Sequence, residues 1–149
     1  MSEFSAFLDN SVFFWSLLSC LFAQFFKIIF NFFSTGKVKF KIMFETGGMP
    51  SSHSALITAA TSGIGFQLGF DNPIFALAIA VSLIVMYDAS GVRKSAGIQA
   101  AEINKLSKIF GPKSQVALKE TLGHTKFEVI VGSLLGPLIT LPGIVFIGY

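Results

Sequence analysis

The chain has 149 residues, of which 52% are hydrophobic and 13% are charged, with a formal net charge of +3 at pH 7. A mean hydropathy of +0.71 excludes an ordinary soluble domain, so we expect the lipid bilayer to be the main solvent. Because one spanning helix needs about 20 apolar residues, the length leaves no room for a separate soluble domain. Residues 1–149 are predicted to form a single membrane domain.

The first apolar run covers residues 11–33 and is rich in phenylalanine, as expected of a membrane-spanning helix. It contains the single cysteine, Cys20, which has no partner for a disulfide. Glu3 and Asp9 precede it without any basic residue, which is the wrong charge for a secretory signal. We therefore expect this run to be retained as the first span.

A loop follows, and residues 51–70 form a second, weaker candidate span that begins after Pro50, where a proline is tolerated. Asp71, Asn72 and Pro73 predict a tight turn. Residues 73–88 are strongly apolar and form a third span of barely sufficient length.

Residues 91–110 have a different pattern, because apolar residues recur at helical spacing between charged ones. This pattern is typical of an amphipathic helix on the membrane surface, and Gly111 and Pro112 are expected to end it. Residues 126–148 form the fourth predicted span, with glycines for close helix packing. The predicted fold class is an all-α integral membrane protein with about four transmembrane helices and one amphipathic cytoplasmic surface helix.

The charges agree with this topology. All eleven Lys and Arg residues fall in or next to the first and third loops, whereas Glu3, Asp9 and Asp71 are the only charges expected on the other side. By the positive-inside rule the basic loops face the cytoplasm and both termini face outward.

The two histidines, His53 and His124, begin the second and fourth spans, so both are expected at the cytoplasmic face. Helix N-termini present unpaired N–H groups and a positive dipole end, which suit a phosphate. One imidazole can attack phosphorus while a second protonates the leaving oxygen. Glu128 lies four residues after His124, on the same face of a helix, where it could orient the attacking ring.

Two short motifs, PSSH at 50–53 and HTKFE at 124–128, resemble the PSGH and H-x-x-x-D motifs of the type 2 phosphatidic acid phosphatases. With AQFFK, GGMPSSHSA, MYDASGVRKSAGIQA and LKETLGHTKFEV, the chain resembles their divergent membrane branch, related to acid phosphatases and vanadium-dependent haloperoxidases. This resemblance covers about residues 23–136. It implies a metal-independent membrane phosphatase, without a cofactor, that hydrolyses a lipid-linked or other membrane-delivered phosphate or pyrophosphate through a phosphohistidine.

By position, the resemblance implies that His124 is the nucleophile, Glu128 its orienting carboxylate and His53 the general acid. The phosphate would be bound by backbone, hydroxyl and cationic groups, namely Gly48, Ser51, Ser52, Lys119, Arg93 and Lys27, with Asp88 as an accessory residue. The family's first motif, a lysine followed by Arg-Pro, has no counterpart, and only Lys27 or Lys41 could replace its lysine. The arginine of the third motif is replaced by Leu118.

Simpler interpretations stay open. Thr125 and Glu128 fit a helix capping box, Lys27 could snorkel to the membrane boundary, and Asp88 could bind a cation or pair with Arg93. The whole chain could instead be a non-catalytic protein that binds or moves a phosphorylated lipid, and a minor alternative makes His53, Asp88 and His124 metal ligands. The expected partners are membrane lipids and a phosphorylated lipid or small phosphate ester, with no nucleic acid and a homo-oligomer left open.

Overall fold

A computed structural model describes residues 9–38, 40–44, 47–110 and 116–147. Its elements in chain order are α2 (Ser11–Thr35), η1 (Phe40–Phe44), α3 (Ser52–Leu68), α4 (Pro73–Tyr87), η2 (Asp88–Val92), α5 (Arg93–Phe110), α6 (Lys126–Pro142) and η3 (Gly143–Ile147). No strand occurs in these residues, which confirms the all-α class. The expected helix stop at Gly111 and Pro112 lies outside the described residues.

Local sequence signals set the helix ends. The side chain of Asn10 accepts from the Phe13 N–H at 2.9 Å and begins α2, and Gly36, with φ of +67°, ends it. Asn72 caps α4 in the same way, accepting from the Ile74 N–H at 2.9 Å with Pro73 as first helical residue. The expected turn is present, with the Asn72 N–H donating to the Gly69 carbonyl at 3.3 Å, and it leads directly into the cap of α4.

Three helical stretches are long and apolar enough to cross a membrane, namely Ser11–Thr35, Pro73–Phe110 and Lys126–Ile147. The protein is thus an integral membrane protein in contact with membrane lipids. The second expected span corresponds to α3, whose 17 residues advance about 25 Å. A crossing by α3, and with it the count of four spans, stays a prediction.

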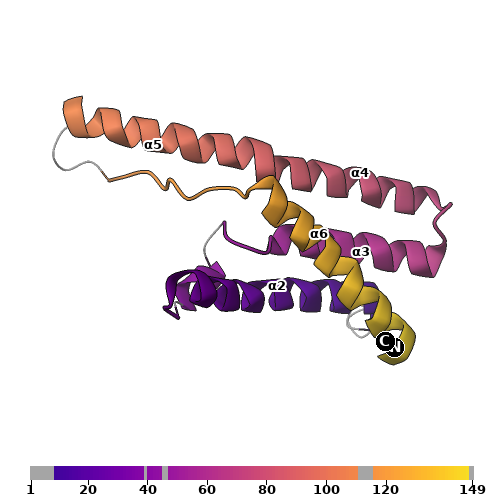
Figure 1. The fold of residues 1–149 in the computed structure, drawn as a ribbon. Helices are drawn as coiled ribbons and strands as arrows, with labels where there is room; N and C mark the ends of the chain where they lie inside the picture. The colour runs from indigo at the N-terminus through magenta and orange to yellow at the C-terminus, as the bar shows by residue number, and fades with distance from the viewer. Residues whose placement is uncertain (1–8, 39, 45–46, 111–115, 148–149) are drawn as a thin grey trace.

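α3 lies at the centre of the bundle and packs against α2, α4 and α6 (Figure 1). The helix contacts are made by small and polar residues. Ala55 and Ala59 are fully buried, Thr61 Oγ1 lies 2.7 Å from Ser82 Oγ, and Ser19 pairs with Thr140 across the bundle at 3.4 Å. Large apolar side chains point outward instead, the arrangement expected where lipid is the solvent.

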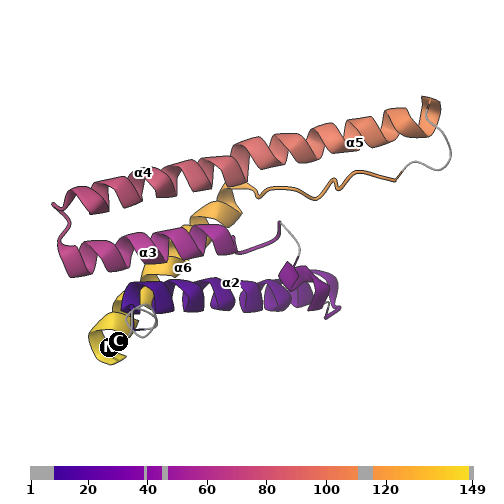
Figure 2. The same cartoon turned by 180° about the vertical axis from the view of Figure 1, so that it is seen from behind.

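α4 continues into α5 through the π-helical turn η2, where the sequence predicted a break at residues 88–91. α5 is amphipathic as expected: Gly97 and Ala100 are buried on one face, while Leu106 and Phe110 are exposed on another. It follows the direction of α4 and extends beyond the bundle (Figures 1 and 2). The helix is continuous across residues 73–110, because the π turn adds one residue without ending the hydrogen-bonded ladder. The placement of α5 on the membrane surface stays a prediction.

Candidate active site

His124 lies in an extended segment, residues 116–125, which runs back alongside α5 to the start of α6 (Figure 2). We call it the return segment. The His124 N–H donates to the Ala89 carbonyl in η2 at 2.9 Å. Gly123 has φ of +77°, and a Cβ there would collide with the backbone of Lys94. The return segment therefore meets the α4–α5 junction so closely that only glycine fits before the histidine.

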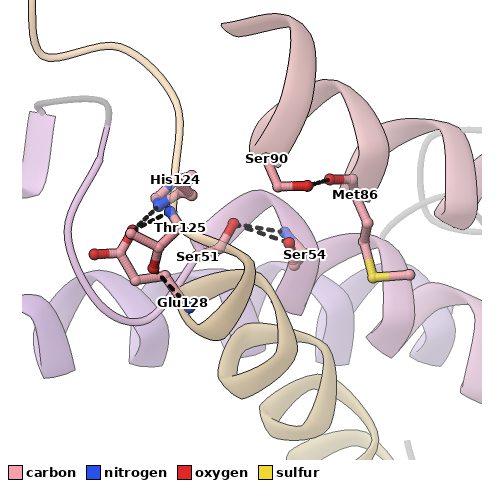
Figure 3. Close-up of polar contacts among 7 residues, drawn as sticks. All are labelled: Ser51, Ser54, Met86, Ser90, His124, Thr125 and Glu128. Carbon is pink, nitrogen blue, oxygen red and sulfur yellow. Dashed lines mark hydrogen bonds and ion pairs between the residues drawn. The ribbon is translucent and has the colours of Figure 1, made fainter. Parts of the chain in front are cut away.

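One carboxylate oxygen of Glu128, in the first turn of α6, contacts both Thr125 and His124. Its Oε2 accepts from the Thr125 N–H at 2.9 Å and lies 3.3 Å from His124 Nδ1. The Thr125 hydroxyl accepts from the Glu128 N–H at 3.2 Å, which completes a capping box (Figure 3). Because a carboxylate only accepts, Nδ1 of a neutral His124 carries the proton and Nε2 keeps its lone pair.

His124 is only 5% exposed. Burial lowers its pKa below the ordinary value of 6.5, and the positive charge of Lys27 lowers the pKa further, while Glu128 acts in the opposite direction. The ring is consequently neutral at neutral pH, which is the form that can act as a nucleophile.

The N-terminus of α3 lies beside this cluster (Figure 3). The Ser51 N–H donates to the Glu128 carbonyl at 3.1 Å. The Ser51 hydroxyl caps α3 by accepting from the N–H and the hydroxyl of Ser54, at 3.3 and 2.9 Å. Ser51 and Ser52 are 0% and 1% exposed. Both serines thus have a structural place, and their role as phosphate ligands stays a prediction.

His53 is exposed at the second position of α3. The charges of Arg93, Lys27 and Asp88 act on it, and its own charge acts on His124. The two histidines expected to meet are therefore within electrostatic reach of each other.

A cavity of about 470 Å³ opens next to these groups, between α2, residues 42 and 47–49, and the return segment. It is lined by Lys27, Phe30, Asn31, Ser34, Ile42, Gly47, Gly48, Met49, Thr121 and Glu128. Lys27 is 3% exposed, and its charge interacts with that of Glu128. The cavity has the size of a small-molecule pocket and combines a buried cation with the backbone of Gly47 and Gly48.

Comparison with known proteins identifies the family. The model described as the divergent PAP2 family matches residues 8–139, most of the chain. The chain belongs to the divergent PAP2 family. The chain is similar to the uncharacterized membrane protein YuiD of Bacillus subtilis (strain 168). The two sequences are 41% identical, and the alignment covers 85% of this chain and 89% of the relative. No solved structure matches.

In this divergent PAP2 family chain, the other expected phosphate ligands lie in different places. Arg93 begins α5, and its Nε donates to Asp88 Oδ2 at 2.5 Å, so Asp88 pairs with Arg93. Lys119 is exposed in the return segment, five residues before His124, which corresponds to about 16 Å of extended chain. The structure therefore brings Lys27 to the cavity, keeps Arg93 near His53 and does not bring Lys119 to His124.

The described residues hold no group of three His, Cys, Asp or Glu side chains that could bind a metal. Three groups of the candidate site were not predicted from the sequence. They are Asn31 and Thr121 in the cavity lining, and the Ala89 carbonyl that accepts from the His124 N–H. The carbonyl leaves no signal in a sequence, because every residue has one.

Proposed function

We propose that this protein is a membrane phosphatase that hydrolyses a lipid-linked or other membrane-delivered phosphate or pyrophosphate. The observation that carries the proposal is the buried His124, held by Glu128 through Nδ1, beside a cavity with the buried cation Lys27. Membership of the divergent PAP2 family agrees with phosphatase-related chemistry.

In the proposed reaction, Nε2 of His124 attacks phosphorus, the N–P bond forms and the P–O bond to the leaving group breaks. His53 donates a proton to the leaving oxygen, and Glu128 stabilises the positive charge that develops on the His124 ring. Water then attacks phosphorus, His53 takes a proton from it, and His124 is released with free phosphate. Lys27 and Arg93 offset the charge of the phosphate oxygens, each beside one of the histidines.

A second, apolar groove of about 310 Å³ supports a substrate with a hydrocarbon chain. Its wall includes Phe75, Leu83 and Met86. Thr58, also in the wall, donates to the Ser54 carbonyl at 2.8 Å, so the groove begins one helical turn from the serines at the start of α3. By the charge distribution, we propose that the site faces the cytoplasm.

The test uses the purified full-length protein in detergent micelles, with phosphate release from phosphatidic acid, from a prenyl pyrophosphate and from a water-soluble phosphate ester. We expect turnover by the wild type, loss of at least about a hundredfold in His124→Ala, and unchanged turnover in Gln99→Ala, a change on an exposed face of α5. Phosphate release that persists in His124→Ala would overturn the proposal.

The pH dependence of kcat/KM provides an independent test of His124 as the nucleophile. Since the nucleophile must be neutral and the pKa of His124 is lowered, the acid-side decline of kcat/KM should lie below pH 6.5, where the ring is protonated. Because His53 must carry a proton to act as the general acid, kcat/KM should also fall as pH rises on the alkaline side. An acid-side decline centred above pH 6.5 would contradict His124 as the nucleophile.

A second candidate is a non-catalytic protein that binds a phosphorylated lipid. The near-complete burial of His124 favours it, because a nucleophile must reach its substrate. Saturable binding of phosphatidic acid without phosphate release from any of the three substrates would select this candidate.

A further inference from the structure

The return segment is held to α5 by one buried side chain, Asn104, which is 7% exposed. Its Nδ2 donates to the Leu118 carbonyl and to Glu120 Oε1, each at 2.8 Å. Its Oδ1 accepts from the Leu118 N–H, also at 2.8 Å. The side-chain amide thus pairs with both backbone groups of Leu118, as a neighbouring strand would.

Such pairing selects one register. A buried amide is costly unless its donors and acceptor are satisfied, and here Leu118 and Glu120 satisfy both ends. Gly97, two turns earlier on α5, adds a steric contact, because a Cβ there would lie 2.5 Å from the Glu120 carbonyl oxygen. Side chains alternate where the segment is extended, so a slip of one residue would turn the side chains that lie beside Asn104 to the opposite side.

The segment between Asn104 and the site has little spare length. Six residues from Leu118 to His124 span at most about 21 Å when extended. The other end of the segment is fixed at Ala89, whose carbonyl accepts from the His124 N–H. Along the helix axis, Ala89 and Asn104 are fifteen residues or about 22 Å apart, close to the full reach of the segment. The turn in which the Leu122 N–H donates to the Glu120 carbonyl at 2.9 Å holds the spare length, so a displacement at Leu118 that leaves this turn closed is passed on to His124.

We propose that Asn104 is a positioning residue: by pairing with Leu118 it fixes the register of the return segment and so places His124 against Ala89 and Glu128. The effect on turnover rests on the proposed phosphatase function. The effect on the placement of His124 does not.

The chain contains only two histidines, so ¹³C-histidine NMR of the full-length protein in micelles can follow His124 directly, with His53→Gln assigning the signals. Three ionisable groups act on His124, namely Lys27, Glu128 and His53. In Asn104→Ala we expect the pH midpoint of the His124 titration, followed by its NMR signal, to rise toward about 6.5, the pKa of an unperturbed histidine. We also expect kcat to fall about tenfold or more, with KM within about twofold, because a misplacement of about 1 Å is enough for such a loss.

Gln99→Ala is the matched control, since it removes an exposed amide from the same helix and should leave the His124 signal unchanged. Glu120→Ala removes one of the three bonds and should give an intermediate shift, whereas Glu120→Gln keeps an acceptor for Asn104 and should restore the wild-type signal. If Asn104→Ala does not fold, Asn104→Asp decides, because it keeps the bond from the Leu118 N–H and loses the other two.

A folded Asn104→Ala or Asn104→Asp protein with a wild-type His124 titration would overturn the proposal. A shifted His124 titration in a protein whose wild type releases no phosphate would support the positioning role and contradict the proposed phosphatase function. The two ideas can thus fail separately.

Discussion

At the scale of single residues, the carboxylate of Glu128 joins a helix cap to a histidine. Its Oε2 accepts from the Thr125 N–H and lies beside His124 Nδ1, so the capping box and the orienting carboxylate are the same group. From the sequence alone, the capping box and the orienting carboxylate were alternative interpretations of Glu128. The geometry makes them compatible, and substitutions can separate their contributions.

Glu128→Gln should keep the cap, because glutamine also serves at the third position of a capping box, while removing the charge beside His124. We expect a thermal midpoint close to that of the wild type and a fall in kcat of about a hundredfold. Thr125→Ala should do the reverse, lowering stability by about 1 kcal/mol and leaving most of the turnover. Thermal unfolding and phosphate release measured on both variants check this, and equal turnover in both would contradict the orienting role.

At the scale of the elements, the site depends on how closely α6 approaches α3. A Cβ at Gly132 would collide with the Ser51 carbonyl, and one at Gly136 would lie 2.5 Å from the Ala55 carbonyl oxygen. These glycines allow the N-termini of α3 and α6 to come into contact. At this contact the Ser51 N–H donates a hydrogen bond to the Glu128 carbonyl. The packing of the two helices therefore places His53 near His124.

Gly132→Ala sets two effects against each other. Alanine favours a helix over glycine by about 1 kcal/mol, but the added methyl group overpacks the contact with Ser51 at a cost of about 1–3 kcal/mol. We expect the steric effect to prevail and both the thermal midpoint and the turnover to fall. Ser133→Ala, the next residue, loses a bond to the Ile130 carbonyl and serves as control for the thermal midpoint. A higher midpoint in Gly132→Ala would show that α6 can shift freely.

At the scale of the whole molecule, the number of crossings depends on α3, which is surrounded by helices and shorter than the other spans. Single cysteines in a Cys20→Ser background test it. Lys37→Cys and Asp71→Cys flank α3, and Val116→Cys follows α5; all three positions are exposed. On intact cells an impermeant maleimide should label only Asp71→Cys, with the other two labelled after permeabilisation. Labelling of Lys37→Cys and Asp71→Cys from the same side would mean that α3 does not cross.

The sequence alone determined the features that depend on near neighbours along the chain. Apolar runs predicted the helices, and Asn72 and Pro73 marked the start of α4. The pairing of Glu128 with His124 was predicted as a contact on one helix face, and the structure makes it instead between the first turn of α6 and the residue before its N-cap. The family resemblance pointed to the same histidines, and the family match confirms the family. Periodicity and capping chemistry are local, so they can be read from the order of residues.

Only the tertiary structure decided which distant groups meet. It buried Lys27 at the cavity, left Lys119 away from His124, joined α4 to α5 and paired Asn104 with Leu118. Neither the difference between Lys119 and Arg93 nor the role of Asn104 was predictable from the sequence, because charge and polarity do not say which face of a helix meets which segment. Backbone partners such as the Ala89 carbonyl are set by the path of the chain, and the path is fixed by close helix packing at residues far apart in the sequence.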